Sequence, residues 1–194
     1  MSISITLHRS GTSRTQQVDT TTTGLDLFGS DRAVVAMRVD GNLVDLQREL
    51  HDGAEVEPVE ATSEDGLNII RHSATHVMAQ AVQQLYPEVN LGIGPFITDG
   101  FYYDFGNIEP VTPEVLSELE KRMKRIVKEN QRFVRRVTTE ESAREELADQ
   151  PYKLELIGTK GKGAEGASVE VGGGELTIYD NVRRNGEVAW KDLC

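Results

Sequence analysis

The hydrophobic pattern divides the chain into two parts. Up to about residue 61, apolar residues form short runs that alternate with polar residues, as in Ile3, Ile5 and Leu7. An alternation of this period is typical of half-buried strands. After residue 61, two long segments carry apolar positions three or four residues apart, which is typical of amphipathic helices. The pattern therefore predicts two domains, residues 1–61 and residues 62–194.

The first part predicts five short elements. The apolar run 34–39 meets Asp40-Gly41, a hairpin signal, before a second apolar run at 43–46. A short helix fits before Gly29, although Gly24 weakens it, and the segment 53–66 supplies a last strand before an acidic junction. Elements in this order predict a small β-grasp, ubiquitin-like fold.

The second part predicts helices and strands in succession. A helix from about Gly66 to Tyr86 ends at Pro87, and two strands with a tight turn follow near Asp99-Gly100. A long helix begins with Thr112 as N-cap and Pro113 in its first position. Its apolar stripe, which should face the core, comprises Leu116, Leu119, Met123, Ile126, Val127 and Val134.

The C-terminal part predicts one more helix and a set of strands. A capping box of Thr138 with Glu141 should begin a helix that runs to Ala148. Four strands are then expected, with a Gly- and Lys-rich loop at 159–167 after the first of them: Lys153–Ile157, Val169–Val171, Leu176–Tyr179 and Val188–Trp190. The predicted fold class of the whole chain is α+β.

Charge separates one segment from the rest of the chain. The 194 residues have a net charge of −11, which argues against indiscriminate nucleic-acid binding. The run from residue 121 to residue 136 is strongly basic, and a solvated helix face is one reading of it. A surface for a phosphate backbone is the other. The candidate nucleic-acid-binding residues are Lys121, Arg122, Lys124, Arg125 and Lys128.

Targeting signals and cysteine usage favour a cytoplasmic protein without a membrane partner. No apolar run approaches the roughly 20 residues that cross a bilayer, and the N-terminus has no signal-peptide pattern. A single Cys forms no internal disulfide, which fits a reducing compartment.

Two histidines four residues apart, His72 and His76, are the first candidate chemistry. On a helical wheel they share a face opposite the apolar stripe that contains Val77 and Leu85, so they should lie off the core. Three interpretations remain: a solvated polar face, a buried structural pair, and a metal-binding or catalytic pair. A zinc protease is excluded, because its general base would stand where this chain has Ser73.

Four motifs in order carry a resemblance to a known family: IIRHSATHVMAQAV, LGIGPFITDGFYYDF, PYKLELI and WKDLC. With them, the chain resembles the N-terminal part of bacterial threonyl-tRNA synthetases. The first domain resembles the TGS domain of that family, and the second resembles the tRNA-editing domain that follows it.

The resemblance implies a set of site residues. It makes His72 and His76 the paired imidazoles of an editing pocket, Tyr103 and Lys153 its tyrosine and lysine, and Asp192 and Cys194 part of its last motif. We expect an imidazole to position or deprotonate water, Lys153 to supply positive charge, and Asp192 to orient an imidazole or accept the substrate's amine. His72, His76 and Cys194 are candidate zinc ligands. Apart from this possible zinc, we expect the segment to require no cofactor.

The resemblance also implies an activity. The family attaches threonine to tRNA(Thr) with ATP, and its editing domain hydrolyses mischarged seryl-tRNA(Thr). The motif that ends at Cys194 normally continues to another His, and the catalytic core with its ATP, Mg and Zn lies beyond that point. We therefore expect a segment truncated within its editing domain, monomeric by itself and part of a homodimer in the full-length enzyme.

Two other functions remain open. The chain could be a non-catalytic tRNA-binding or regulatory module in which the His pair is structural, or a free-standing trans-editing hydrolase. The residues that follow Cys194 would discriminate them, because Arg-Gly-Pro-His and a synthetase core would establish the first interpretation. The sequence does not reveal metal content, or what the TGS domain binds.

Overall fold

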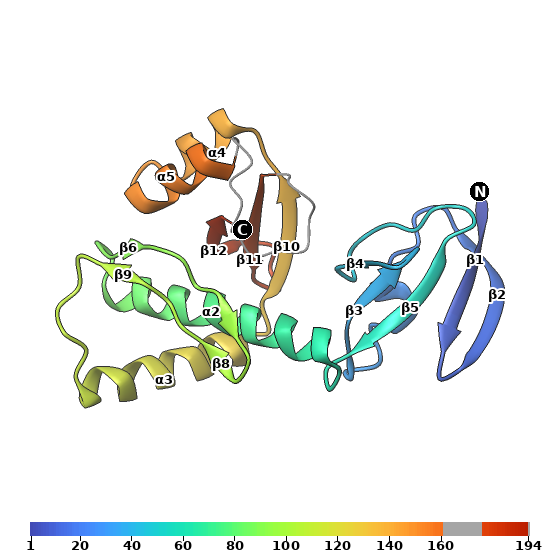
Figure 1. Ribbon diagram of the computed structural model, residues 1–194, viewed down its shortest axis with the longest axis horizontal. Coiled ribbons are helices and arrows are strands. Elements are labelled where there is room, and N and C mark those ends of the chain that lie inside the picture. The colour runs from blue at the N-terminus through green and yellow to red at the C-terminus, as the bar shows by residue number, and fades with distance from the viewer. Residues whose placement is uncertain (161–175, 194) are drawn as a thin grey trace. The chain divides into compact units, whose positions relative to one another are not determined.

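The computed structural model describes residues 1–160 and 176–193 (Figure 1). The expected strand Val169–Val171, most of the expected loop at 159–167 and Cys194 lie outside the described residues. The chain divides into two compact units, Met1–Ile70 and Arg71–Cys194. Each unit combines helices with sheets, so the α+β class is confirmed. Among the described residues, no helix has the length and apolar character needed to span a bilayer.

The first unit is a five-stranded mixed sheet with one short helix. In chain order its elements are β1 (Ser2–Arg9), β2 (Thr12–Asp19), α1 (Gly24–Phe28), β3 (Val34–Val39), β4 (Asn42–Val44) and β5 (Glu55–Glu60). The strand order is β2-β1-β5-β3-β4, in which β1 and β5 are parallel and all other neighbours are antiparallel. This is the arrangement expected of a β-grasp unit.

Alternating side chains build the core of this unit. Ile5, Phe28, Met37 and Val56 are fully buried, and on either side of Val56 the residues Glu55 and Glu57 are exposed. The hairpin predicted at Asp40-Gly41 is present, with positive φ angles at both residues. Strand β2 was not predicted, because its sequence TSRTQQVD is almost entirely polar and its residues are largely exposed.

The second unit places two long helices beside small sheets. Helix α2 (Glu64–Leu85) begins within the first unit and continues into the second, and α3 (Pro113–Glu129) packs in the same core. Between them lie the two-stranded sheets β6 (Asn90–Leu91) with β9 (Phe105–Gly106), and β7 (Phe96–Ile97) with β8 (Gly100–Phe101). The tight turn predicted near Asp99-Gly100 joins β7 and β8.

The remaining elements form an antiparallel sheet with two helices. The sheet has the order β10-β11-β12, made by β10 (Arg132–Val137), β11 (Thr177–Val182) and β12 (Val188–Leu193). Helices α4 (Glu140–Glu146) and α5 (Pro151–Lys160) share a core with one of its faces, through Ala143, Leu147, Ile157, Ile178 and Leu193.

Helix α3 confirms its predicted cap but not all of its predicted core stripe. Thr112 accepts a hydrogen bond from the backbone N–H of Val115, and Pro113 occupies the first turn. Leu116 and Val127 are 59% and 65% exposed, so their assignment to the core is wrong. The helix also ends at Glu129, where Asn130 adopts a left-handed conformation, and Val134 therefore belongs to strand β10.

Two further predictions in the C-terminal part are wrong. The N-cap of α4 is Thr139 and not Thr138, because the Thr139 hydroxyl accepts from the backbone N–H of Ser142. The segment from Lys153 to Ile157 is a helix and not a strand. Pro151 fits the first turn of that helix, and Lys153 and Ile157, four residues apart, are the positions buried on its inner face.

Candidate active site

Helix α2 buries the second histidine of the pair. His76 is only 4% exposed and His72 is half-buried, so the prediction that both lie off the core is wrong for His76. The helical wheel counted only apolar neighbours as core. In the structure, polar residues of α2 are buried as well, namely Thr75 and Gln80.

Three aromatic rings surround the His76 imidazole. Its ring centroid lies 5.9 Å from that of Phe133, 6.0 Å from that of Tyr179 and 5.6 Å from that of Trp190. These residues come from β10, β11 and β12, one from each strand, and the sequence analysis did not single them out. The aromatic residue in each strand was a signal for one shared face, but only strand pairing brings the three together.

The two imidazoles contact each other through their Nε2 atoms, which lie 3.0 Å apart. At this distance one Nε2 donates its proton and the other accepts, so the two rings cannot both be imidazolium. One proton therefore lies between the two Nε2 atoms. His72 is the more exposed of the two and is the one that faces water.

Burial keeps His76 neutral. Removal from water lowers the pKa of His76 to about 3, while the Asp192 carboxylate raises the pKa and His72 and Lys153 lower it. At neutral pH the ring therefore carries no charge, and its Nε2 atom contacts Nε2 of His72.

Lys153, Asp192 and Tyr103 form a second, connected group. The Lys153 ammonium lies 2.7 Å from Asp192 Oδ1, and both side chains are at most 5% exposed. The Tyr103 hydroxyl donates to Asp192 Oδ2 over 2.9 Å, and the Leu193 backbone N–H donates to Asp192 Oδ1 over 2.8 Å. Charged groups are buried at a large cost unless paired, and here each carboxylate oxygen has a donor.

Three distant segments supply this group. Lys153 is in the first turn of α5, Asp192 is in β12, and Tyr103 lies between β8 and β9. Tyr103 stacks on Phe105 with 4.8 Å between centroids, and Gly94 packs directly on its ring. A Cβ atom at Gly94 would lie 2.3 Å from the Tyr103 ring, so glycine at this position permits the close approach.

Hydrogen bonds tie α2 to the sheet that carries the aromatic residues. Asn181 Nδ2 donates to Gln80 Oε1 over 2.9 Å, and the Trp190 indole N–H donates to Gln83 Oε1 over 2.7 Å. A pocket of about 610 Å³ lies beside β12, with Trp190 and Asp192 in its wall. Among the described residues, neither histidine lines this pocket.

Five of the six predicted catalytic residues lie in two groups, and the contacts are within each group. His72 contacts His76, and Asp192 contacts both Tyr103 and Lys153. Cys194 lies outside the described residues, so the predicted zinc set of His72, His76 and Cys194 stays a prediction. Within residues 1–160 and 176–193, no group of three His, Cys, Asp or Glu side chains could hold a metal ion.

The predicted nucleic-acid-binding residues lie on α3 and differ in their neighbours. Arg122 and Lys124 form ion pairs with Glu118 and Glu120, four residues earlier. Lys121, Arg125 and Lys128 are exposed on one stripe of the helix, and among the described residues no ion pair is found for them.

Three relatives found by comparison with known proteins share one name. The chain is 58% identical over 195 residues to "Threonine--tRNA ligase" of Streptomyces avermitilis, covering 99% of this chain and 30% of the relative. It is 62% identical over 180 residues to the protein of that name from Streptomyces griseus, covering 91% of this chain and 27% of the relative. It is 58% identical over 177 residues to the protein of that name from Micrococcus luteus, covering 89% of this chain and 26% of the relative.

No family model matches the chain. The chain spans less than a third of the length of the curated relatives it matches. The resemblance inferred from the four motifs is nevertheless confirmed by these identities: along nearly its whole length, the chain is similar to a segment of threonine--tRNA ligases.

Proposed function

We propose that the chain is the N-terminal segment of a threonine--tRNA ligase, and that residues 62–194 form a module that hydrolyses mischarged seryl-tRNA(Thr). Residues 1–61 would be its TGS domain. One observation carries the proposal: His72, His76, Tyr103, Lys153 and Asp192 come from distant motifs and lie in two groups of contacting side chains, in which His76, Lys153 and Asp192 are buried. Threonine activation with ATP, Mg and Zn is assigned to the part of the relatives that this chain does not span.

The proposed reaction follows from a limit on selectivity. Serine and threonine share a hydroxyl and differ by one methyl group, and a pocket gains only about 1 to 3 kcal/mol from such a difference. A synthetase therefore charges some tRNA(Thr) with serine. A second site that admits serine and excludes the larger threonine removes this product.

In the proposed hydrolysis, water attacks the ester carbonyl carbon and the bond from this carbon to the ribose oxygen breaks. The ribose oxygen takes a proton, and the products are serine and tRNA. The His pair has the chemistry to orient the water and take its proton. The half-buried His72 reaches solvent, and the neutral His76 fixes the Nε2 atom of His72 through the contact between the two rings. This assigns the base to His72 and the positioning role to His76.

We assign to Asp192 a role that differs from the two expected from the sequence. Its two oxygens accept from Lys153, Tyr103 and Leu193, which supports a role in orienting the lysine and the tyrosine rather than an imidazole. An ammonium group has three N–H donors, and Asp192 accepts a hydrogen bond from one of those of Lys153. We assign to Lys153 the stabilisation of the negative charge that develops on the carbonyl oxygen.

The proposal assigns the tRNA backbone to the α3 stripe of Lys121, Arg125 and Lys128. Exposed cations at i, i+4 and i+7 lie along one line of a helix, as contacts to successive phosphates require. Such contacts would position the tRNA without reading its sequence.

Wild-type full-length enzyme that contains this segment provides the direct test. We expect it to hydrolyse seryl-tRNA(Thr) about 10- to 200-fold faster than threonyl-tRNA(Thr), the range that one methyl group allows. The matched substrate controls for access of the tRNA to the site. Equal rates for both substrates, or no hydrolysis of seryl-tRNA(Thr), would contradict the proposal.

A further inference from the structure

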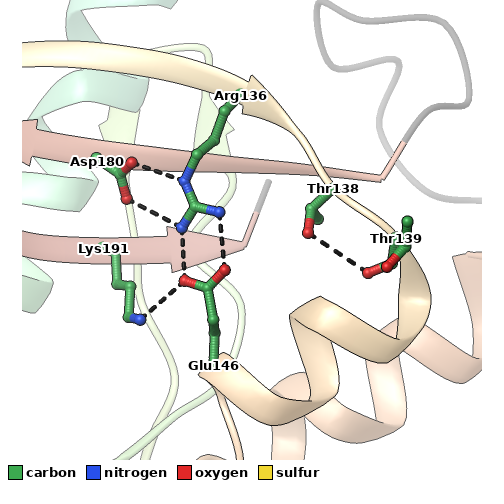
Figure 2. A network of polar contacts seen from close by, with 6 residues as sticks. All are labelled: Arg136, Thr138, Thr139, Glu146, Asp180 and Lys191. Carbon is green, nitrogen blue, oxygen red and sulfur yellow. Dashed lines mark hydrogen bonds and ion pairs between the residues drawn. The ribbon is translucent and has the colours of Figure 1, made fainter.

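Four charged residues form a continuous chain of contacts apart from the candidate site (Figure 2). Asp180 accepts from Arg136 Nε over 2.7 Å, and Glu146 accepts from Arg136 Nη1 and Nη2 over 2.8 and 2.6 Å. Lys191 donates to Glu146 Oε2 over 2.8 Å. This ion-pair chain of Asp180, Arg136, Glu146 and Lys191 links all three strands of the C-terminal sheet to helix α4.

Strand geometry places the ion-pair chain on the face of the sheet opposite the His pair. Lys191 pairs with Asp180 across β11 and β12, whereas Trp190 pairs with Asn181 and Asp192 pairs with Tyr179. Successive side chains in a strand point to opposite faces. Lys191 therefore points toward α4, while Trp190 and Asp192 on either side of it point to the face where they contact His76 and Tyr103.

The contacts are of the kind that fixes geometry. The Arg136 guanidinium makes two hydrogen bonds with each carboxylate, and such forked, charge-assisted contacts constrain direction as well as distance. Hydrogen bonds from Arg136, and then from Lys191, lower the pKa of Glu146 to about 2, so its carboxylate stays ionised. Among residues 1–160 and 176–193, strand β12 has β11 as its one neighbour in the sheet, and Lys191 adds an attachment to α4.

We propose that Lys191 is a positioning residue: held by Glu146 and Arg136, it fixes the edge strand β12 so that Trp190 and Asp192 stay in place against His76 and Tyr103. The catalytic consequence rests on the proposed function. The structural consequence, a fixed environment for Trp190, does not depend on it. Removing the Lys191 charge should leave the forked contacts between Arg136 and both carboxylates in place, so this substitution removes only the contact between β12 and Glu146.

The test uses Lys191→Met, with Lys191→Arg as the conservative variant and Lys124→Met as the matched control. Lys124 pairs with Glu120 on the exposed face of α3, so its loss removes the same charge and one ion pair away from the sheet. Trp190 is the one tryptophan of the sequence and is 8% exposed, so its fluorescence reports on the surroundings of this β12 residue, where it contacts α2. Emission, acrylamide quenching and far-UV circular dichroism are measured on the 194-residue chain, and seryl-tRNA(Thr) hydrolysis on the full-length enzyme.

We expect Lys191→Met to keep the wild-type dichroism, shift the Trp190 emission to longer wavelength and increase quenching. Lys191→Arg should restore both fluorescence signals, and Lys124→Met, the control for the fluorescence measurements, should leave both at their wild-type values. In the full-length enzyme, kcat for hydrolysis should fall about tenfold or more with little change in KM, because misplacement of site groups by an ångström costs rate. Unchanged emission and quenching in Lys191→Met, or a loss of its dichroism, would overturn the positioning role. If wild-type enzyme shows no hydrolysis, the proposed function fails, while the fluorescence still decides the role of Lys191.

Discussion

The two units differ in what they bury. In the part of the chain that the structure describes, the buried side chains of the first unit are all apolar, from Ile3 to Val59. The second unit buries nine polar or charged residues as well: Thr75, His76, Gln80, Gln150, Lys153, Thr177, Asp180, Asn181 and Asp192. A polar group in a core costs stability unless its hydrogen bonds are made.

This difference indicates where the chemistry lies. The core of the first unit is built by apolar packing. The second unit keeps an ion pair and a histidine out of water, which is unfavourable for stability but fixes the geometry of the ion pair and keeps the histidine neutral. The first unit therefore has an apolar core, and the candidate site lies in the second unit.

The largest effect is expected from the buried ion pair. Lys153→Met keeps the volume of the side chain but leaves the Asp192 carboxylate buried without its ammonium partner, which should cost about 3 to 5 kcal/mol of unfolding free energy. Urea denaturation followed by Trp190 fluorescence measures it. Lys124→Met, which removes an exposed ion pair, is the control and should change little. Similar stabilities of the two variants would show that the buried pair does not hold this unit together.

A cavity in the first unit should separate stability from chemistry. Met37 is fully buried there, and Met37→Ala should cost about 2 to 5 kcal/mol through lost packing. Seryl-tRNA(Thr) hydrolysis by the full-length enzyme, measured well below the melting temperature, should stay at the wild-type rate. A reduced rate under those conditions would mean that the first unit takes part in the reaction.

The histidines of the two units should respond to pH in opposite directions. The pKa of His76 is lowered by burial to about 3, so the unfolded chain binds a proton that the folded chain rejects, and stability is lost as pH falls from about 6.5 towards 3. The slope is on the order of 1.4 kcal/mol per pH unit within that window. Chemical denaturation at pH 7, 5.5 and 4 measures it, and His76→Gln should remove this part of the slope.

His51 in the first unit provides the contrast. Hydrogen bonds to the Asp52 carbonyl and the Asp40 carboxylate raise the pKa of His51, so its contribution is present at low pH and is lost as pH rises through the raised value. His51→Gln should therefore lower stability only on the acidic side. The same pH dependence for both variants would contradict the comparison of the two units.

Substitutions in the cationic stripe of α3 should have the smallest effect on the fold. Their expected effect is on tRNA affinity. Substitution of Lys121, Arg125 and Lys128 by Glu should weaken tRNA binding by the full-length enzyme and reduce its salt slope by up to about three. Substitution of three exposed arginines of the first unit, Arg14, Arg32 and Arg48, is the control of equal charge. Equal binding losses in the two triple variants would make the α3 stripe an ordinary solvated face.

The sequence predicted most of the fold where local pattern and fold agree. The hairpin at Asp40-Gly41, the cap at Thr112 and the helix that carries His72 and His76 all depend on residues close in sequence, and the structure contains all three. Strand β2 was missed because it has few apolar residues to alternate.

Errors arose where tertiary contacts decide. Lys153 lies in a segment that alternates like a strand, but a helix lets Lys153 reach Asp192 while Ile157 packs in the core. His76 was assigned to the surface because a wheel of apolar residues cannot anticipate a sheet that covers the polar side of α2 with aromatic rings. The candidate site residues were found through motif resemblance, whereas the geometry that joins them was not predictable from spacing.

The central claim is that the His pair of the second unit carries out ester hydrolysis, and a single-turnover rate of seryl-tRNA(Thr) hydrolysis tests it most directly. His72→Ala is the variant of choice, because His72 is half-buried and its loss leaves the aromatic rings around His76 in place. The matched control is His51→Ala in the first unit. We predict that His72→Ala lowers the hydrolysis rate at least about 100-fold, as loss of a general base does, with threonine charging retained and His51→Ala unchanged. Hydrolysis at the wild-type rate in His72→Ala would contradict the claim.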